Sequence, residues 1–186
     1  MMLSINDLKL GTIIKLEGSP YMVQRLQHVK MGRGGAILRT KLKNLITGNV
    51  LEKNFKGGDK FEEVILEKSK ANFLYKEGKN FYFMMSETFE QFFFDEQKIG
   101  HLEKFLKEGL EIDILKFDGL PQIIELPKKI KLRVKAAPPG IRGDTSQSPT
   151  KSITLETELV VNAPLFIKEG DIVIINTETG EYVERA

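Results

Sequence analysis

One short stretch constrains the fold of this chain more than any other, because it sets an arginine within a tight reversal between two strand-like segments. Residues 29–36 contain three glycines, and Arg33 stands among them. The glycines permit positive φ angles and therefore a sharp turn. Residues 21–26 and 36–45 on either side have strand-like patterning. The pattern predicts a long β-hairpin with Arg33 at its tip.

The strand expected after this turn carries its basic residues on one face. Arg39, Lys41 and Lys43 alternate with less polar residues, and alternate side chains of a strand point to the same side. Three cations on one face suit an anionic partner such as a nucleic acid. The alternative is a solvated surface hairpin that binds nothing.

Charge is distributed unevenly along the chain, although the net charge is only +2. Residues 22–60 contain nine basic and two acidic residues, and residues 127–151 contain seven and one. Residues 61–126 contain eight basic and fourteen acidic residues, and residues 152–186 contain two and seven. Two basic zones separated by acidic ones predict an elongated molecule that contacts a polyanion at two places.

The composition is that of an ordinary globular protein, with 41% hydrophobic and 29% charged residues. None of the 186 residues is a cysteine, which excludes disulfides and thiolate metal sites and suits a reducing compartment. No apolar run approaches the roughly 20 residues that span a bilayer, and the start of the chain lacks the apolar core of a signal peptide. We therefore expect a cytoplasmic protein.

Short strand-like segments separated by turn residues run through the whole sequence, which predicts an all-β protein. Strands of the first region are expected at residues 12–16, 21–26, 36–45 and 50–55. Those of the second are expected at residues 63–67, 71–75, 81–85, 111–117 and 122–126, with a short helix over residues 95–107. Those of the third are expected at residues 130–134, 152–157, 159–161, 172–175 and 182–184, with a long loop over residues 136–149. We expect three small β-barrel domains at residues 1–62, 63–127 and 128–186.

Two further patterns bear on binding. The first strand of the third region repeats the cationic alternation at Lys129, Lys131, Arg133 and Lys135. The second region contains four phenylalanines within residues 88–94, and such rings could stack on nucleic acid bases. Because three carboxylates, Glu90, Asp95 and Glu96, lie among and beside them, we expect these rings to pack in the core instead.

The sequence contains no pattern that indicates catalysis. His28 and His101 are far apart and do not have metal-ligand spacing. The tip glycines lack the Gly-Lys-Ser/Thr ending of a phosphate-binding loop, and no Gly-x-Ser-x-Gly motif occurs. We expect neither a catalytic residue, nor a metal ligand, nor a cofactor.

Along nearly its whole length the sequence resembles the bacterial translation elongation factor P family. The first region carries GRGGA at residues 32–36 and RTKLKNL at residues 39–45. The second carries ETFEQ at residues 87–91, and the third carries PGIRGDT at 139–145, PLFIKEGD at 164–171 and GEYV at 180–183. The resemblance implies three barrels arranged in an L shape. The first would be SH3-like, also described as KOW-like, and the other two would be oligonucleotide-binding (OB) folds.

The resemblance also implies a function without enzymatic activity. Members of the family bind the 70S ribosome between the peptidyl (P) and exit (E) sites and position the acceptor end of the P-site transfer RNA. They stimulate peptide-bond formation and relieve stalling at consecutive prolines. Proline is a poor nucleophile and a rigid donor, so holding the transfer RNA terminus in a reactive pose lowers the entropic part of the barrier. We expect a monomer.

The resemblance assigns roles to particular residues of this chain. Arg33 would contact the acceptor end of the transfer RNA and is the candidate for modification. The tip loop around it is Lys30, Met31, Gly32, Gly34 and Gly35. The phosphate-binding residues would be Arg39, Lys41 and Lys43. The loop facing the small subunit and the E site would be Arg142, Gly143, Asp144 and Thr145.

Several positions depart from the family pattern. Most relatives carry a lysine with an amine-linked extension in place of Arg33, and a guanidinium is a poor acceptor for that chemistry. Some relatives carry a rhamnosylated arginine there, so two alternatives remain open: an arginine-modifying glycosyltransferase acts on Arg33, or Arg33 works unmodified. Met31 replaces a common proline and leaves the tip less stiff. Ile153, Glu158 and Ala163 replace alanine, glycine and valine, and we expect strand positions that tolerate them. An elongation-factor-P-like paralogue and a general RNA-binding module are the alternative functions.

Overall fold

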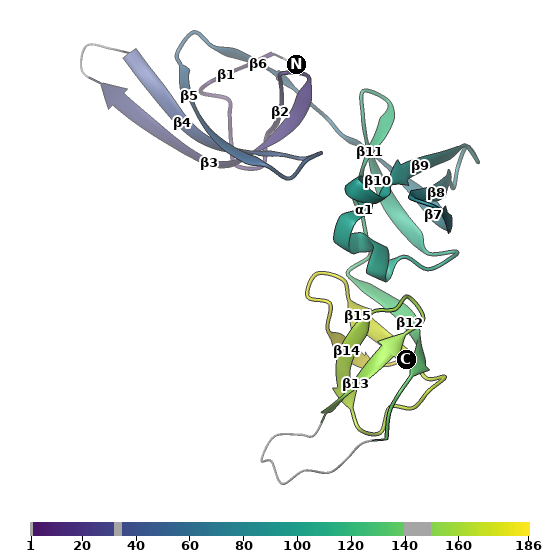
Figure 1. The fold of residues 1–186 in the computed structure, drawn as a ribbon. Coiled ribbons are helices and arrows are strands. Elements are labelled where there is room, and N and C mark those ends of the chain that lie inside the picture. The colour runs from purple at the N-terminus through teal and green to yellow at the C-terminus, as the bar shows by residue number, and fades with distance from the viewer. Residues whose placement is uncertain (1, 32–34, 140–149) are drawn as a thin grey trace. The chain divides into compact units, whose positions relative to one another are not determined.

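The computed structural model describes residues 2–31, 35–139 and 150–186 of the chain. In this part of the chain nearly all regular structure is β-strand, and the strands form three sheets (Figure 1). The predicted all-β class is therefore confirmed. By backbone contacts the chain divides into two compact units, Met1–Lys68 with Ile114–Ile123, and Ser69–Asp113 with Ile124–Ala186.

The first sheet has six strands in the order β1-β6-β2-β3-β4-β5. Their bounds are β1 (Met2–Ser4), β2 (Ile13–Leu16), β3 (Ser19–Met31), β4 (Gly35–Asn44), β5 (Val50–Lys56) and β6 (Lys60–Glu63). Strand β1 was not expected from the sequence, and it pairs antiparallel with β6. The prediction of a strand at residues 63–67 is wrong. Strand β6 ends at Glu63, which pairs with Ile14 of β2.

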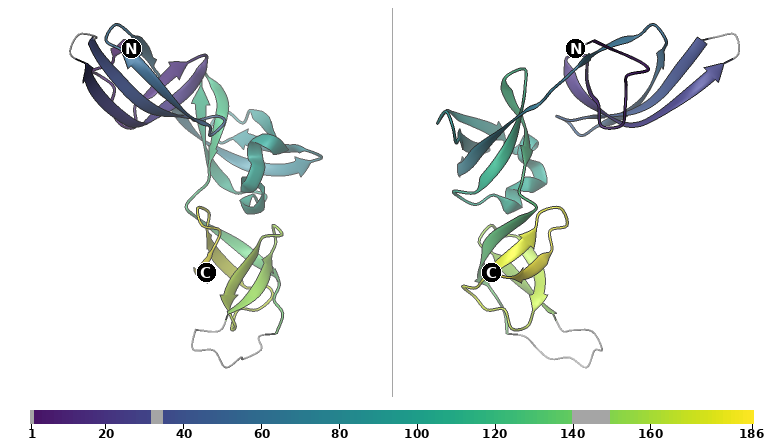
Figure 2. Two further views of the ribbon diagram at one scale, coloured as in Figure 1. Left: turned by 60° about the vertical axis from the view of Figure 1, so that its left-hand side comes forward. Right: turned by 180° about the vertical axis from the view of Figure 1, so that it is seen from behind.

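The predicted long hairpin is confirmed by β3 and β4, which are 13 and 10 residues long. Their antiparallel register runs from Tyr21 opposite Asn44 to Met31 opposite Gly35, with a bulge between Val23 and Arg25. The two views of Figure 2 show these strands as a long ribbon that extends from the remainder of the first sheet. The predicted tip, residues 32–34, lies outside the described residues.

Alternate residues of β4 anchor this hairpin in the core of the first sheet. Leu38 and Leu42 are fully buried, and Thr40 between them is 4% exposed. The Thr40 hydroxyl donates a hydrogen bond of 2.8 Å to the backbone oxygen of Lys53 in β5, which satisfies a polar group that would be costly to bury alone. All three inward residues of β4 therefore fix the strand in the core, two by apolar packing and Thr40 by a hydrogen bond.

The second sheet has the order β11-β10-β7-β8-β9. Its strands are β7 (Glu67–Glu77), β8 (Asn80–Met85), β9 (Gln91–Asp95), β10 (Glu111–Phe117) and β11 (Leu120–Glu125). Asp118 and Gly119 both have positive φ angles, 49° and 77°, as a two-residue type I′ hairpin between β10 and β11 requires. Pro121 lies on edge strand β11, where a missing N–H is tolerated.

The helix expected over residues 95–107 is only partly present. Asp95 caps helix α1 (Glu96–Ile99) by accepting a hydrogen bond of 2.8 Å from the Lys98 N–H. Gly100 then takes a φ of 53°, which ends the α-helix, and residues 100–105 form a 3₁₀ helix instead. The apolar spacing therefore located the buried residues Ile99 and Phe105 but not the break between them.

The expected core packing of the phenylalanine run is wrong for two of its rings. Phe94 is buried, but Phe89 and Phe93 are 70% and 56% exposed. Strand alternation places Phe93 on the face of β9 opposite to Phe94. Phe89 lies in the turn before β9 with a φ of 58°, an uncommon conformation for a bulky residue.

The third sheet has the order β14-β13-β12-β15-β16. Its strands are β12 (Lys129–Ala136), β13 (Thr150–Leu155), β14 (Val160–Pro164), β15 (Ile172–Asn176) and β16 (Tyr182–Arg185). Glu158, which the strand prediction left between residues 152–157 and 159–161, lies in the turn between β13 and β14 with a φ of 62°. The expectation that it is a strand position tolerant of this substitution is therefore wrong. That conformation explains why glycine suits this position better.

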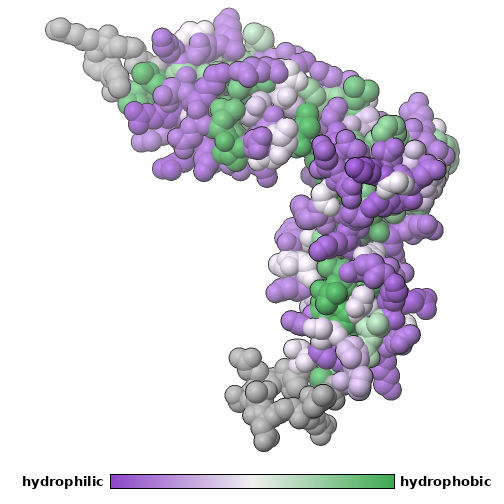
Figure 3. Space-filling model, in the orientation of Figure 1, coloured by the Kyte–Doolittle hydropathy of each residue, from purple (hydrophilic) through white to green (hydrophobic). Residues whose placement is uncertain are grey.

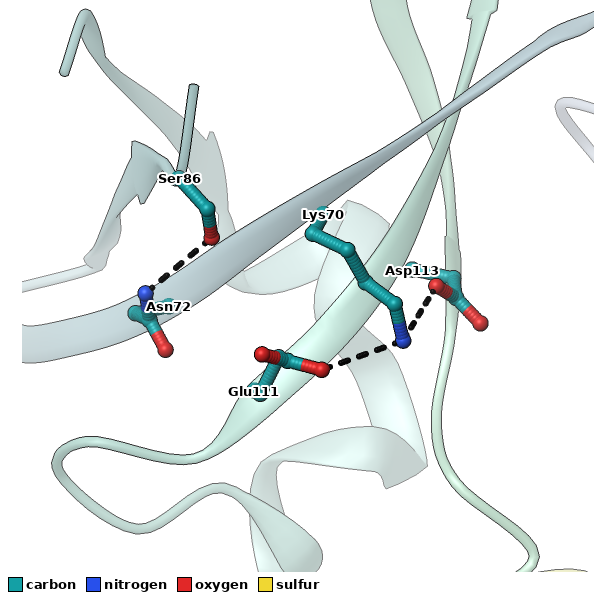
Figure 4. Close-up of polar contacts among 5 residues, drawn as sticks. All are labelled: Lys70, Asn72, Ser86, Glu111 and Asp113. Atoms are coloured by element: carbon teal, nitrogen blue, oxygen red, sulfur yellow. Dashed lines mark hydrogen bonds and ion pairs between the residues drawn. The ribbon is translucent and has the colours of Figure 1, made fainter. Parts of the chain in front are cut away.

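A lysine links two strands of the second sheet. The Lys70 Nζ lies 2.9 Å from an Asp113 oxygen and 3.1 Å from a Glu111 oxygen, while Asn72 donates a 3.2 Å hydrogen bond to the Ser86 hydroxyl (Figure 4). The hydrogen bonds to Asp113 and then Glu111 raise the pKa of Lys70 above its ordinary value of 10.5. Lys70 therefore joins β7 to β10 while it is charged.

This lysine gives the first prediction, which concerns stability at alkaline pH. A raised pKa contributes stability that is complete below 10.5 and declines as the pH rises through the folded-state value. As the pH rises above 10.5 through the folded-state pKa, Lys70→Met should therefore lose less stability than the unsubstituted chain. Urea unfolding followed by circular dichroism at several pH values measures this, with the exposed Lys79→Met as control. Equal decreases in all three proteins would contradict the role of Lys70.

Candidate functional site

The candidate site is the outward face of the β3–β4 hairpin. Because Leu38, Thr40 and Leu42 point inward, the residues between and beyond them point outward, and Arg39 and Lys41 are exposed. Lys43, the third predicted cation of this strand, is partly buried. The structure thus brings these three predicted residues together on one face. Figure 3 shows that hydrophilic residues cover most of the visible surface around the hairpin.

Strand β3 adds a fourth cation that the sequence reasoning missed. In the antiparallel register Arg25 lies opposite Lys41, and Gln27 lies opposite Arg39. Both β3 residues are exposed. The signal for them was present in the alternation of β3, but only the register shows which β4 residues they face. We call Arg25, Arg39, Lys41 and Lys43 the basic face.

Three residues of the basic face, Arg25, Arg39 and Lys41, line a shallow hollow of about 200 Å³. Its lining residues are Arg25, Gln27, Arg39, Thr40, Lys41, Glu52 and Asn54. Asn54 and Glu52 come from β5, opposite Arg39 and Lys41. The hollow therefore offers guanidinium, ammonium and amide donors to one acceptor, and these are the groups that bind phosphate oxygens. It also contains one carboxylate, that of Glu52 opposite Lys41.

The electrostatics of the basic face favour an external anion. Arg25 and Lys41 lie directly opposite each other, and like charges in such a pair destabilise a sheet. Within the described part of the chain none of the four cations takes part in an ion pair. A bound phosphate would relieve this repulsion, so the face is suited to a polyanion.

The second predicted cationic strand, β12, differs in this respect. Its apolar residues point inward as predicted, with Leu132 fully buried, and its basic residues are exposed. However, Lys129 lies 3.8 Å from a Glu184 carboxylate oxygen, and Lys135 pairs with Glu158. Part of the positive charge on this strand is therefore neutralised within the protein.

The remaining predicted site residues lie where side chains are not described. Arg33, Gly32 and Gly34 lie outside the described residues, as do Arg142, Gly143, Asp144 and Thr145. For Lys30, Met31 and Gly35 the structure gives only the backbone register, in which Met31 lies opposite Gly35. Their roles stay predictions.

The described residues lack two features. They contain no group of three or more histidine, cysteine or acidic side chains that could hold a metal ion. They also contain no helix that is long and apolar enough to cross a membrane.

The fold and the basic face together define a class of protein, namely small all-β domains with a surface suited to a polyanion. Three family models match in succession: the elongation factor P KOW-like domain at residues 4–61, the elongation factor P OB domain at residues 66–124, and the elongation factor P C-terminal domain at residues 130–185. The chain therefore belongs to the elongation factor P family. It is a translation elongation factor, not an enzyme, and a factor of this kind works with the ribosome.

Individual relatives agree with this assignment. Elongation factor P of Moorella thermoacetica is 44% identical and that of Dictyoglomus turgidum is 45% identical, each over 185 residues that cover 100% of both chains. Among solved structures, eukaryotic translation initiation factor 5A from Methanococcus jannaschii matches with a TM-score of 0.57 and 20% identity. That match covers 68% of this chain and 94% of the other, and it shows a shared fold.

The contrast between the two cationic strands gives the second prediction. For a short structured RNA, Arg39→Gln or Lys41→Gln should reduce the slope of log K against log salt concentration by about 0.7–0.9 for each phosphate that is no longer bound. Lys129→Gln should change the slope much less, because Lys129 already faces Glu184. Fluorescence anisotropy at several salt concentrations measures the slopes. Equal changes in the three variants would show that the basic face has no special role.

Proposed function

We propose that this elongation factor binds the 70S ribosome between the P and E sites and positions the acceptor end of the P-site transfer RNA. In this proposal it stimulates peptide-bond formation and relieves stalling at consecutive prolines. The observation that carries the proposal is the basic face, which has no ion pair within the described residues and lies on the hairpin whose connection contains Arg33. The family assignment over the full chain supports it. The three domains and their L-shaped arrangement are part of the proposal.

The hairpin relates the basic face to Arg33. The pair Gln27 and Arg39 lies four residues from the last pair, Met31 and Gly35, which corresponds to about 13 Å along the strands. Arg33 is the central residue of the connection that follows. Phosphates held by the basic face would therefore lie on the path toward the transfer RNA terminus, and the cations would fix the position of the hairpin without reading sequence.

Arg33 would act by positioning and not by bond chemistry. A guanidinium presents five N–H donors in a rigid fork and stays protonated, so it can hold the sugar and backbone at the acceptor end in one orientation. Holding the terminus in a reactive pose reduces the entropy that must be given up on reaching the transition state. Proline gains most from this help, because its own geometry makes the reactive pose rare.

The other roles follow from the same proposal. Arg142, Gly143, Asp144 and Thr145 belong to the connection between β12 and β13, and they would contact the small subunit beside the E site. We propose that the factor acts as a monomer in the cytoplasm, without a cofactor.

The role of Arg33 gives the third prediction. In a purified translation system, Arg33→Ala should reduce the stimulation of a reporter with three consecutive prolines by about tenfold or more, because nothing then holds the transfer RNA terminus in its reactive pose. Yield of the full-length reporter is the measurement, and the exposed Lys104→Ala is the control. Full activity of Arg33→Ala would refute the tip assignment. A general RNA-binding module would leave the reporter unstimulated even without substitution.

The chemical state of Arg33 gives the fourth prediction. We propose that an arginine-modifying glycosyltransferase adds a deoxyhexose to its guanidinium. Protein purified from its native host should then show the added mass on the peptide that contains Arg33, and protein from a host without the enzyme should not. An unmodified native peptide together with full activity would establish instead that Arg33 works without modification.

A further inference from the structure

Three aromatic side chains form a continuous row across the second sheet. Tyr75 of β7 lies opposite Tyr82 of β8, and Tyr82 lies opposite Phe93 of β9. The ring centroids of Tyr75 and Tyr82 are 4.9 Å apart in a stacked arrangement, and those of Tyr82 and Phe93 are 5.8 Å apart. We call these three residues the aromatic row.

The aromatic row lies on the outer face of the sheet. Tyr75 is 42% exposed and Phe93 is 56% exposed. The phenylalanines of the same strands that form the core are buried; they are Phe73, Phe81, Phe83 and Phe94. Large rings that gather on one surface are available to be covered by another molecule, and their rigid shape makes them effective anchors at interfaces.

Carboxylates border the aromatic row. Glu77 of β7 and Asp95 of β9 both lie opposite Asn80 of β8, one cross-strand row beyond the aromatic one. Each carboxylate residue follows an aromatic residue of the row by two positions. It therefore lies on the same face of the sheet, about 7 Å along the strand from that aromatic residue. On the other side of the aromatic row, the next pair is Met84 opposite Gln91. The residues that border the rings are therefore acidic or uncharged.

Lys76, the lysine beside the aromatic row along β7, is directed elsewhere. Lys76 lies between Tyr75 and Glu77 along β7, so it points to the opposite face. There its Nζ lies 4.8 Å from the centroid of the buried Phe81 ring and pairs with Glu103. Lys79 lies in the turn between β7 and β8. The aromatic row thus combines exposed rings with negative charge.

We propose that the aromatic row is a docking surface for an arginine-bearing segment of a protein partner. A guanidinium stacks on aromatic faces and pairs with carboxylates. The aromatic row supplies the rings, and Glu77 and Asp95 supply carboxylates about 7 Å away along the same strands. Bases could also stack on the rings. However, the phosphates of a nucleic acid would then meet the carboxylates of Glu77 and Asp95. The charge therefore favours a basic peptide.

This surface is separate from the site proposed for the transfer RNA. The aromatic row belongs to the second sheet, whereas the basic face belongs to the first. The two surfaces also have opposite charge, so they select opposite partners. The inference does not rest on the proposed role of Arg33, and either can fail without the other.

The test uses the ¹⁵N-labelled full chain and a synthetic peptide that repeats Leu-Arg-Pro. A second peptide carries citrulline in place of every arginine and so keeps the shape while removing the charge. The arginine peptide should shift the amide signals of β7, β8 and β9, and the citrulline peptide should bind about tenfold more weakly. Phe93→Ser and Tyr75→Ser should each weaken binding about tenfold. Leu120→Ser removes a 61% exposed apolar side chain from β11 and should change nothing.

Several results would overturn the inference. They are the absence of saturable shifts up to about 1 mM peptide, equal binding of the citrulline peptide, and unchanged binding by Phe93→Ser. Shifts of the same signals by an RNA oligonucleotide but not by the peptide would assign the surface to a nucleic acid. If a ring substitution unfolds the sheet, Glu77→Gln tests the proposal instead, because it removes an exposed charge without removing a packed ring. It should weaken peptide binding several-fold.

Discussion

The site depends on the burial of alternate residues in β4. Leu38, Thr40 and Leu42 fill the core of the first sheet, and because strand side chains alternate, this burial forces Arg39 and Lys41 outward. A slip of one residue would turn the cations into the core and the leucines into water. The hydrophobic effect therefore fixes the orientation of charges that contribute nothing to the core themselves.

The three sheets use the same alternation for different surface chemistry. The cations of β4 have no ion-pair partners within the described residues, whereas two of the four basic residues of β12 are matched by Glu184 and Glu158. The second sheet exposes stacked aromatic rings beside carboxylates. A protein that must approach a polyanion with one surface gains from keeping its acidic and aromatic surfaces elsewhere, since they weaken indiscriminate binding.

Sequence patterns succeeded where one local property decided the structure and failed where two competed. The alternation of residues 111–117 located β10 to the residue. The helical spacing of residues 95–107 was real, but the positive φ of Gly100 divided the segment into an α-helical turn and a 3₁₀ helix. A run of consecutive phenylalanines shows no alternation of polar and apolar residues that would indicate which rings face inward. The pattern therefore did not predict the exposure of Phe93. Glu158 was expected to be a tolerant strand position, although the backbone turns there.

The sequence by itself determined the all-β class, the long hairpin, the cationic alternation of β4 and the family. These depend on residue order along one strand or on motifs that are contiguous in the chain. Only the tertiary structure decided which residues of different strands share a surface. It placed Arg25 opposite Lys41 and joined Tyr75, Tyr82 and Phe93 into one row. The physical reason is that cross-strand register comes from pairing and bulges between segments distant in sequence, and no single strand contains that information.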